Sequence, residues 1–440
     1  MIKIQKASEV EESFFNGRNF SESIETVQNV LKDIQNRKDE ALLEYTVKFD
    51  KVHPQQFEIP AETLKACADK MKQNNPNLYN SLCYSRDLAL KFALKQKESF
   101  DDFEIELEKG VFTGQKNIPV EKAGVYVPAG RFPLVSTVVM TVTPAVAAGC
   151  KEIILCTPPR VFPGDNADSS KPYADENIMA AAYICGVTKA FCCGGAQAIA
   201  AMAFGTQSIP KVDVIVGPGN KFVAEAKKSV YGTCGIDMVA GPTEVFIIAD
   251  SSADPRWVAA DLLAQAEHDI VAQPVMATND EKLALAVQKE IEIQLETLAT
   301  KATARQSIDN CGRIILTDTI EEAAELANRK APEHLELAMD EGESRDNIQK
   351  LVHNYGSLFI GHGSAEVFGD YAAGLNHTLP TSGSARFTGG LSVRVFLKTV
   401  TTLRTVSGAE GTVKSATAAG YLGDAEGLAA HARAARLRLE

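Results

Sequence analysis

The sequence predicts an α/β protein with largely parallel sheets. From about residue 120 onward, short apolar runs alternate with stretches whose apolar residues have the spacing of a helix, and several runs end at Pro or Gly. The chain of 440 residues, with 45% hydrophobic and 23% charged residues, is long enough for roughly two to four domains with sizeable cores. Alternation of this kind is typical of parallel sheets whose strands are buried on both faces.

The first hundred residues are expected to form helices. Their apolar side chains recur at spacings of three and four, as they do on the buried face of an amphipathic helix. These residues are Ile24, Val27, Leu31, Ile34, Ala41, Leu42, Tyr45 and Phe49. We interpret the stripe as a packing surface.

Six apolar runs are interpreted as buried strands, with helices between them. The runs are 124–127, 153–156, 212–216, 245–248, 314–316 and 358–360, and the clearest helices are 137–148, 196–204 and 254–267. Asp254 is a good N-cap for the last helix, and Pro255 suits its first turn. Segment 160–175, rich in Pro, Gly, Asp and Ser, is interpreted as a surface insertion. After Gly390 the Ala-rich sequence predicts helices too short to form a core of their own.

Charge and composition disfavour several classes of partner. The formal charge of −12 repels both a phosphate backbone and an anionic membrane surface, so we expect neither nucleic acid nor membrane binding. The start of the chain lacks a signal-peptide pattern and no run of 18 apolar residues follows, which predicts a cytoplasmic protein. Nine cysteines without a Cys-x-x-Cys pair indicate reduced thiols instead of disulfides or a thiolate zinc site.

Four of the seven histidines lie in short clusters with carboxylates or amides in the C-terminal half. The clusters are 265–268, 331–334, 369–377 and 426–431. Imidazole, carboxylate and amide oxygen are ligands that suit a borderline divalent ion such as zinc, and further acid and imidazole groups remain for proton transfer. The clustering therefore predicts metal-assisted proton chemistry.

Each cluster also has a simpler interpretation. Gln265 and His268 share a helix face and could reach one ion, but a histidine near a helix C-terminus is also favoured by the helix dipole. The pair 333–334 follows a proline that should end a helix starting near residue 319, so it could be a solvated turn. Segment 370–377 could be a solvated loop. Glu426 and His431, five apart on an apparent helix, do not share a face well. Four such coincidences together are much less credible than each one alone.

Two glycine-rich turns, 193–197 and 217–220, each follow a predicted strand. Phosphate-binding turns also join a strand to a helix, but neither turn has the G-x-G-x-x-G spacing of dinucleotide-binding loops. On these residues alone, a structural turn is the favoured interpretation of each. The chain also lacks a Walker loop, a G-x-S-x-G elbow and an H-E-x-x-H motif, which disfavours the kinases and hydrolases that use them.

Eight ordered motifs give the chain a resemblance to the histidinol dehydrogenase family over nearly its whole length. They are GVYVPAG at 124–130, GGAQAIAA at 194–201, GPGN at 217–220, AGPTE at 240–244, DLLAQAEH at 261–268, APEHLE at 331–336, GDY at 369–371 and NHTLPT at 376–381. The resemblance implies a zinc-dependent enzyme at the end of histidine biosynthesis. Such an enzyme oxidises L-histidinol to L-histidine through the aldehyde and reduces two NAD+ per turnover.

The resemblance also implies a fold and a domain arrangement. The family's fold is like that of aldehyde dehydrogenases, with two incomplete Rossmann-like domains, one inserted in the other, and helical N- and C-terminal arms that embrace a second subunit. The implied boundaries are 1–20 for the N-terminal helical arm, 21–126 with 244–390 for the domain carrying metal and catalytic residues, 127–243 for the inserted NAD-binding domain, and 391–440 for the helical dimerisation tail.

Site residues follow from the same resemblance, position by position. The implied ligands of one Zn2+ per subunit are Gln265, His268, Asp370 and His431, and the implied acid and base are Glu333 and His334. Tyr126, Gln197 and Asn220 match the NAD contacts. Around the substrate the resemblance places Thr243, Gln265, His268, His334, Asp370, His377, Glu426 and His431.

Two features depart from the family pattern, and two rival functions remain open. Thr243 stands where many relatives have serine, and the insertion at 160–175 is longer than usual. A relative on the same scaffold could oxidise another amino alcohol or a hydroxylated sulfonate, although the complete zinc set with Glu426 and His431 argues against this. From another class, a zinc-dependent amide hydrolase or a non-catalytic metal-binding protein would leave the predicted NAD contacts without a role.

Overall fold

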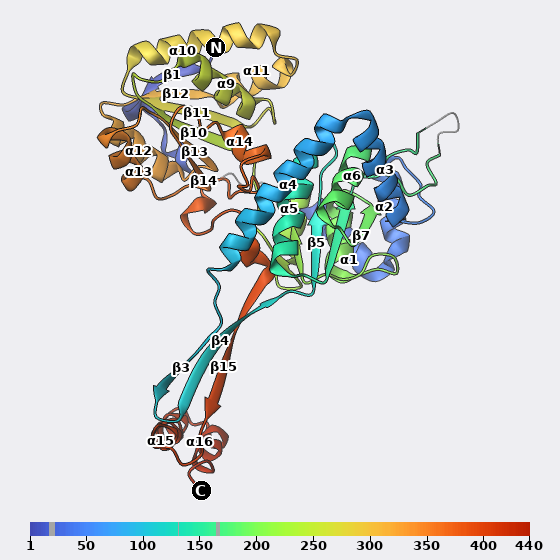
Figure 1. The fold of residues 1–440 in the computed structure, drawn as a ribbon, viewed down its shortest axis with the longest axis vertical. Coiled ribbons are helices and arrows are strands. Elements are labelled where there is room, and N and C mark those ends of the chain that lie inside the picture. The colour runs from blue at the N-terminus through green and yellow to red at the C-terminus, as the bar shows by residue number, and fades with distance from the viewer. Residues whose placement is uncertain (17–22, 131, 164–167) are drawn as a thin grey trace.

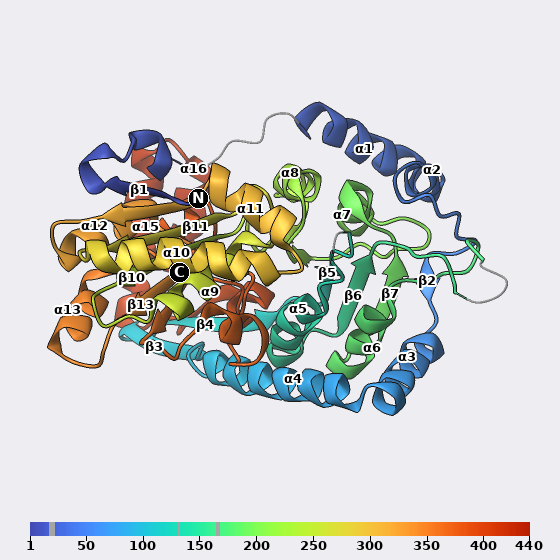
Figure 2. The same cartoon turned by 90° about the horizontal axis from the view of Figure 1, so that it is seen from above.

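The computed structural model describes residues 1–16, 23–130, 132–163 and 168–440. Within these ranges the chain forms two six-stranded sheets and one three-stranded sheet (Figure 1). The two larger sheets lie side by side in separate lobes (Figure 2). We call them sheet A and sheet B, and the three-stranded sheet with the C-terminal helices the projection. Among the helices in the described ranges, none has the length and apolar character needed to cross a bilayer.

Sheet A is parallel throughout. Its strands are, in spatial order, β1 (Lys3–Lys6), β12 (Arg313–Leu316), β11 (Gln273–Thr278), β10 (Glu244–Ala249), β13 (His334–Ala338) and β14 (Ser357–Ile360). Its helices are α9 (Pro255–Ala266), α10 (Glu281–Thr297), α11 (Lys301–Asn310), α12 (Ile320–Lys330) and α13 (Glu343–Leu351). Alternate residues of β10 pack on opposite faces: Val245 and Ile247 join the core under α9 and α10, whereas Phe246 and Ile248 join the core under α12.

Sheet B has the same layered construction, with one antiparallel edge strand. Its strands are, in spatial order, β2 (Glu58–Ile59), β7 (Lys189–Cys192), β6 (Glu152–Thr157), β5 (Lys122–Tyr126), β8 (Val214–Val216) and β9 (Gly235–Ile236). One face packs on α1 (Ile24–Arg37), α2 (Asp39–Asp50), α7 (Gly195–Phe204) and α8 (Lys221–Val230). The other packs on α3 (Ala61–Asn74), α4 (Pro76–Lys97), α5 (Val135–Ala148) and α6 (Glu176–Cys185).

The projection extends away from both lobes (Figure 1). It contains the antiparallel strands β3 (Phe103–Glu108), β4 (Val111–Pro119) and β15 (Leu397–Thr405), followed by α15 (Glu410–Ala425) and α16 (Ala429–Arg436). Gly110, at the turn between β3 and β4, has φ +84°, and a Cβ there would lie 2.2 Å from Ala409 Cβ. The turn therefore packs directly against the start of α15. The short helix α14 (Glu366–Tyr371) lies outside the three sheets, by sheet A.

The predicted α/β class, with one unit inserted in the other, is confirmed, and each of the six predicted strands overlaps a strand of the structure. Asp254 caps α9 by accepting from Arg256 N, and Pro255 is its first residue, as expected. The implied boundaries need correction, because β5 pairs with β6 and β8. The described part of 21–126 thus builds sheet B and the projection instead of joining 244–390.

The two expected helical arms are also corrected. Segment 1–16 contains β1 and two 3-10 helices, η1 (Ala7–Glu9) and η2 (Glu12–Phe15), and Phe14 and Phe15 pack in the sheet A core; the expected residues 17–20 lie outside the described ranges. The tail 391–440 contains the 3-10 helix η5 (Val393–Phe396) and then the strand β15, whose sequence is rich in Thr and other β-branched residues that favour a pleated strand. The α-helices predicted for the tail begin only at Glu410, with α15 and α16. Asp370, expected in a loop, lies in α14.

Candidate active site

Glu333 and His334 lie buried at the start of β13. Helix α12 ends at Lys330, Ala331 adopts φ 51°, and Pro332 then prevents the helix from continuing, as the sequence predicted. The neighbouring strand β10 begins at Glu244, and Val245 is the register partner of His334. Glu333 and His334 therefore lie at the amino end of β13, beside the amino end of β10, in the middle of sheet A.

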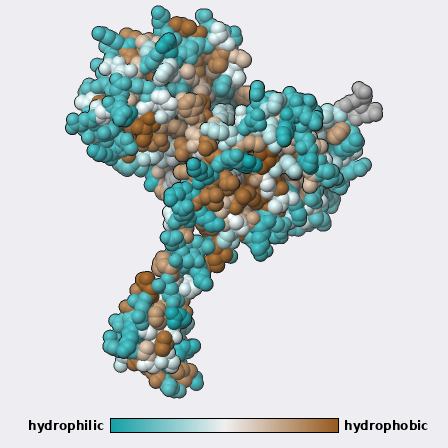
Figure 3. Space-filling model, in the orientation of Figure 1, coloured by the Kyte–Doolittle hydropathy of each residue, from teal (hydrophilic) through white to brown (hydrophobic). Residues whose placement is uncertain are grey.

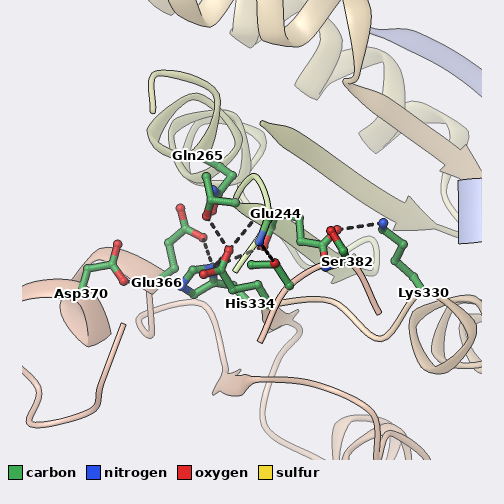
Figure 4. Close-up of polar contacts among 11 residues, drawn as sticks. Glu244, Gln265, Lys330, His334, Glu366, Asp370 and Ser382 are labelled. Carbon is green, nitrogen blue, oxygen red and sulfur yellow. Dashed lines mark hydrogen bonds and ion pairs between the residues drawn. The ribbon is translucent and has the colours of Figure 1, made fainter. Parts of the chain in front are cut away.

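A chain of hydrogen bonds fixes the Glu333 carboxylate (Figure 4). Thr243 Oγ1 donates to Glu333 Oε2 at 2.5 Å, and Glu244 N donates to the same oxygen at 3.0 Å. Since the Thr243 proton is used in this way, its oxygen accepts from Gln265 Nε2 at 2.5 Å. The amide orientation of Gln265 is thus set, and its Oε1 remains available for a ligand.

The His334 ring is oriented by the main chain of Glu244. Its Nδ1 lies 3.3 Å from Glu244 O, and a carbonyl oxygen can only accept, so Nδ1 carries the proton. The lone pair of the neutral ring is then on Nε2, which lies 3.5 Å from Asp370 Oδ1. His334 therefore presents its basic nitrogen toward α14.

Burial and neighbouring charge shift the pKa values of this pair. Burial raises the pKa of Glu333 to about 7, against the opposing effects of His334 and of the Thr243 hydrogen bond. Burial would lower the pKa of His334, but Glu333, Asp370 and Glu366 together raise it well above its usual value. Burial also raises the pKa of Glu336 to about 8, with Asp261 adding to the effect.

Sequence reasoning missed several buried charged residues around the pair. Glu336 and Glu366 are 5% and 2% exposed, and Glu366 Oε2 lies 3.9 Å from His334 Nδ1. Glu244 and Lys330 form a buried ion pair of 2.8 Å. The available signal was a glutamate within the apolar strand 334–338 and another at the start of 244–249, since charged residues are almost never fully buried unless paired.

Several buried polar atoms of the site have no hydrogen-bond partner among the described residues. They are His334 Nε2, Glu366 Oε2, Asp370 Oδ1 and His377 Nε2. The 3.5 Å between His334 Nε2 and Asp370 Oδ1 is long for a hydrogen bond. Buried polar atoms are rarely left unpaired in native proteins, so these four atoms indicate a place for a ligand.

The implied metal ligands are not all together within one chain. Gln265 and Asp370 are near His334, and His268 is exposed just beyond α9. Burial would raise the pKa of Asp370, but its interactions with His334, His377 and His268 together lower it. His431 is exposed on α16 at the far end of the projection (Figure 1), and Glu426 is exposed after α15. In the part of the chain that the structure describes, no group of three or more His, Cys, Asp or Glu side chains could hold a metal ion.

The residues expected to contact NAD lie at the carboxyl ends of sheet B strands. Tyr126 ends β5 and its hydroxyl accepts from Gly195 N at 3.0 Å. Gln197 lies in the first turn of α7, after β7, and donates to Asp50 at 3.3 Å. Asn220 follows β8 and caps α8. This edge is where open parallel sheets bind nucleotides.

Comparison with known proteins identifies the family. A histidinol dehydrogenase family model matches residues 16–439. The chain is 44% identical to the histidinol dehydrogenase of Streptococcus mutans, covering 94% of this chain and 92% of the relative, and 43% identical to that of Aquifex aeolicus with the same coverage. A crystal structure of histidinol dehydrogenase from Elizabethkingia anophelis superposes with TM-score 0.89 at 36% identity, covering 100% of this chain and 98% of that one. This chain belongs to the histidinol dehydrogenase family.

Membership of the histidinol dehydrogenase family makes the chain an oxidoreductase of histidine biosynthesis that acts on a small molecule, as the motifs predicted. The fold is also similar to that of an NAD-dependent aldehyde dehydrogenase from Sinorhizobium meliloti, with TM-score 0.50, 12% identity and 87% of each chain covered. That likeness concerns the fold alone. It confirms the expected similarity of the fold to that of aldehyde dehydrogenases.

Replacing Thr243 tests the hydrogen-bond chain. Thr243→Val keeps the shape of the side chain but removes the hydroxyl that joins Gln265 to Glu333. We expect kcat/KM for L-histidinol to fall by roughly 10- to 100-fold, the usual cost of losing a group that orients a ligand side chain. Thr243→Ser, which keeps the hydroxyl, is the matched control and should stay close to wild type. Equal activity of the two variants would show that the hydroxyl has no such role.

Proposed function

We propose that this chain is a zinc-dependent enzyme that oxidises L-histidinol to L-histidine through a bound aldehyde, using two NAD+. The observation that supports this most directly is the buried, adjacent Glu333 and His334, beside unpartnered polar atoms of Asp370 and His377. Two successive oxidations need a base for an alcohol and then activation of water, and the acid and imidazole provide one group for each task.

The donor set of the site fits zinc. Asp370 Oδ1 is a buried carboxylate oxygen with no hydrogen-bond partner among the described residues, and Gln265 uses its amide nitrogen to bind Thr243, which leaves its Oε1 for a ligand. Gln265, His268 and Asp370 from one subunit, with His431, would hold the ion through nitrogen and oxygen only. When bound, zinc would act as a template that fixes the substrate's imidazole and amino nitrogens.

The missing imidazole is proposed to come from a second copy of the chain. Large apolar side chains along the projection are exposed, which is typical of a surface that another protein covers (Figure 3). They include Ile105 at 50%, Leu107 at 61%, Leu403 at 72%, Tyr421 at 71% and Leu422 at 65%. In the proposed homodimer, the projection of one subunit brings Glu426 and His431 to the site of the other.

The first oxidation uses His334. Its Nδ1 is held by the Glu244 carbonyl, so Nε2 takes the proton of the substrate hydroxyl. NAD+, when bound near Tyr126, Gln197 and Asn220, would accept the hydride from the alcohol carbon of the substrate. General-base assistance of this kind typically contributes ~10²- to 10⁴-fold. Thr243, His377 and Glu426 are proposed to line the substrate together with the zinc ligands and His334.

The second oxidation uses both members of the pair. Glu333 accepts a proton from the water that attacks the aldehyde. His334, after releasing the proton of the first oxidation, then takes the hydroxyl proton of the resulting hydrate, and a second NAD+, when bound, would accept the hydride. Both side chains are less than 10% exposed, so bulk water is largely excluded from them. Enclosure of this kind limits loss of a reactive aldehyde to side reactions.

Metal removal and product counting test the proposal as a whole. A site built only from nitrogen and oxygen ligands should lose its ion to chelators more readily than a four-thiolate zinc site. We expect chelation to abolish activity and zinc, and also manganese or cobalt, to restore it. The restored enzyme should form two NADH per L-histidinol consumed. Full activity of metal-free enzyme, or one NADH per substrate, contradicts the proposal.

Substitutions in the pair should separate the two oxidations. Glu333→Gln removes the group that activates water, so alcohol oxidation should survive better than aldehyde oxidation. His334→Asn removes the base of both steps, and both should fall by ~10²- to 10⁴-fold. The rates are measured separately with L-histidinol and with histidinal. If Glu333→Gln slows both substrates equally, the division of labour is wrong.

Subunit complementation tests the shared site. Homodimers of His268→Ala and of His431→Ala each lack one ligand in every site and should be nearly inactive. In the co-expressed heterodimer, one site combines the intact His268 of one subunit with the intact His431 of the other. Purified heterodimer should therefore show roughly half of wild-type activity. If His431 served its own subunit's site, every site would lack a ligand, and the heterodimer would be no more active than its parents.

A further inference from the structure

We propose that Lys227 and Asp237, a buried ion pair beneath the turn 217–220, are positioning residues for NAD+. The inference rests on the proposed function, in which Tyr126, Gln197 and Asn220 contact the cofactor. Neither Lys227 nor Asp237 reaches the site itself. Their role is to hold the turn that carries Asn220 against the strand that carries Tyr126.

The ion pair grips both main-chain polar groups of Gly217. Lys227 Nζ donates to Gly217 O at 2.8 Å, and Gly217 N donates to Asp237 Oδ2 at 2.8 Å. The two charged groups also contact each other directly, and Asp237 Oδ1 accepts from Met238 N at 2.7 Å. The side chains of Lys227 and Asp237 are 2% and 0% exposed. A buried charge pair with these additional bonds holds its partners in one geometry.

Gly217 is in turn pressed against Tyr126. It has φ +118°, and a Cβ at this position would lie 2.2 Å from Tyr126 O. The strands meet here, since Val125 and Val216 are register partners. The Tyr126 hydroxyl accepts from Gly195 N, at the start of the helix that carries Gln197. A shift of Gly217 therefore changes the spacing of the turn from the other proposed NAD contacts.

Asn220 is fixed by the helix that carries Lys227. Its side-chain oxygen caps α8 by accepting from Phe222 N at 3.0 Å and Val223 N at 3.2 Å. Lys227 lies on the same helix and reaches back beneath the turn. Helix α8 is thus tied to Gly217 through Lys227, and this leaves the amide nitrogen of Asn220 facing away from the cap.

The effect of the pair on stability can be separated from its effect on NAD+ binding. Replacing a buried ion pair by apolar residues of similar size is often neutral or stabilising, whereas removing one partner alone is strongly destabilising. The double variant Lys227→Met/Asp237→Leu should therefore keep the melting temperature close to that of wild type. It loses the two charge-assisted hydrogen bonds to Gly217. A loss of NAD+ binding in this double variant would therefore not result from a loss of stability.

The experiment compares full-length wild type with this double variant in steady-state kinetics. We expect KM for NAD+ to rise by roughly 10- to 100-fold, as for lost positioning groups elsewhere, while KM for L-histidinol changes less than about threefold. Lys97→Met is the matched control, because Lys97 also donates to main-chain carbonyls of this lobe, those of Ala147 and Ala148 at the end of α5. Its KM for NAD+ should stay at the wild-type value.

A double variant whose KM for NAD+ stays within about twofold of wild type overturns the inference. If the double variant does not fold, Lys227→Met/Asp237→Asn is measured instead, because it also removes both charges and keeps the shape of Asp237. The same rise is expected in KM for NAD+, and an unchanged KM overturns the inference there too. A wild-type enzyme whose rate does not depend on NAD+ would instead contradict the proposed function, so the two failures are distinguishable.

Discussion

Glu244 connects the elements that build the catalytic pair. Its amide nitrogen donates to Glu333, its carbonyl oxygen faces His334 Nδ1, and its carboxylate accepts from Ser382 N at 2.9 Å and pairs with Lys330. Lys330 ends the helix that leads into the pair. Glu244 therefore holds both the catalytic pair Glu333–His334 and the lysine at the end of the preceding helix. Removing the charge of either Glu244 or Lys330 would leave the other charge buried and unpaired, which typically lowers the free energy of unfolding by about 3–5 kcal/mol.

The two buried lysine-carboxylate pairs lie at the two ends of one short connection. Asp237 follows β9 of sheet B, Thr243 and Glu244 lead into β10 of sheet A, and between them Gly241 N donates to Thr381 Oγ1 at 2.5 Å. The segment that holds the proposed cofactor turn thus continues directly into the residues that hold the acid and the imidazole. The proposed cofactor turn and the reacting groups are therefore joined by one short stretch of main chain.

Local patterns in the sequence predicted six strands of sheets A and B and the limits of α9 and α12, because apolar runs, the Asp254 cap and Pro332 act within a few residues. They did not predict which sheet β5 joins, since pairing in a parallel sheet depends on contacts between distant residues. The strand β15 was not predicted, because the Ala-rich sequence after Gly390 was interpreted as helical throughout. The ordered motifs found Glu333, His334 and Thr243, but the buried partners Glu244, Lys330 and Glu366 became visible only when their surroundings were known.

Strand β1 is synthesised before β12, with which it pairs. Lys3 therefore cannot pair until Arg313 has been synthesised. At about 5–20 residues per second, synthesis of the intervening chain of about 310 residues takes roughly 15–60 s. Every strand of sheet B emerges within that interval, so we expect its lobe to fold first on the ribosome. Meanwhile β1 exposes unpaired backbone, and the lysines at both of its ends discourage pairing with other nascent chains. Sheet A then closes after sheet B, around the strand of sheet A that was made first.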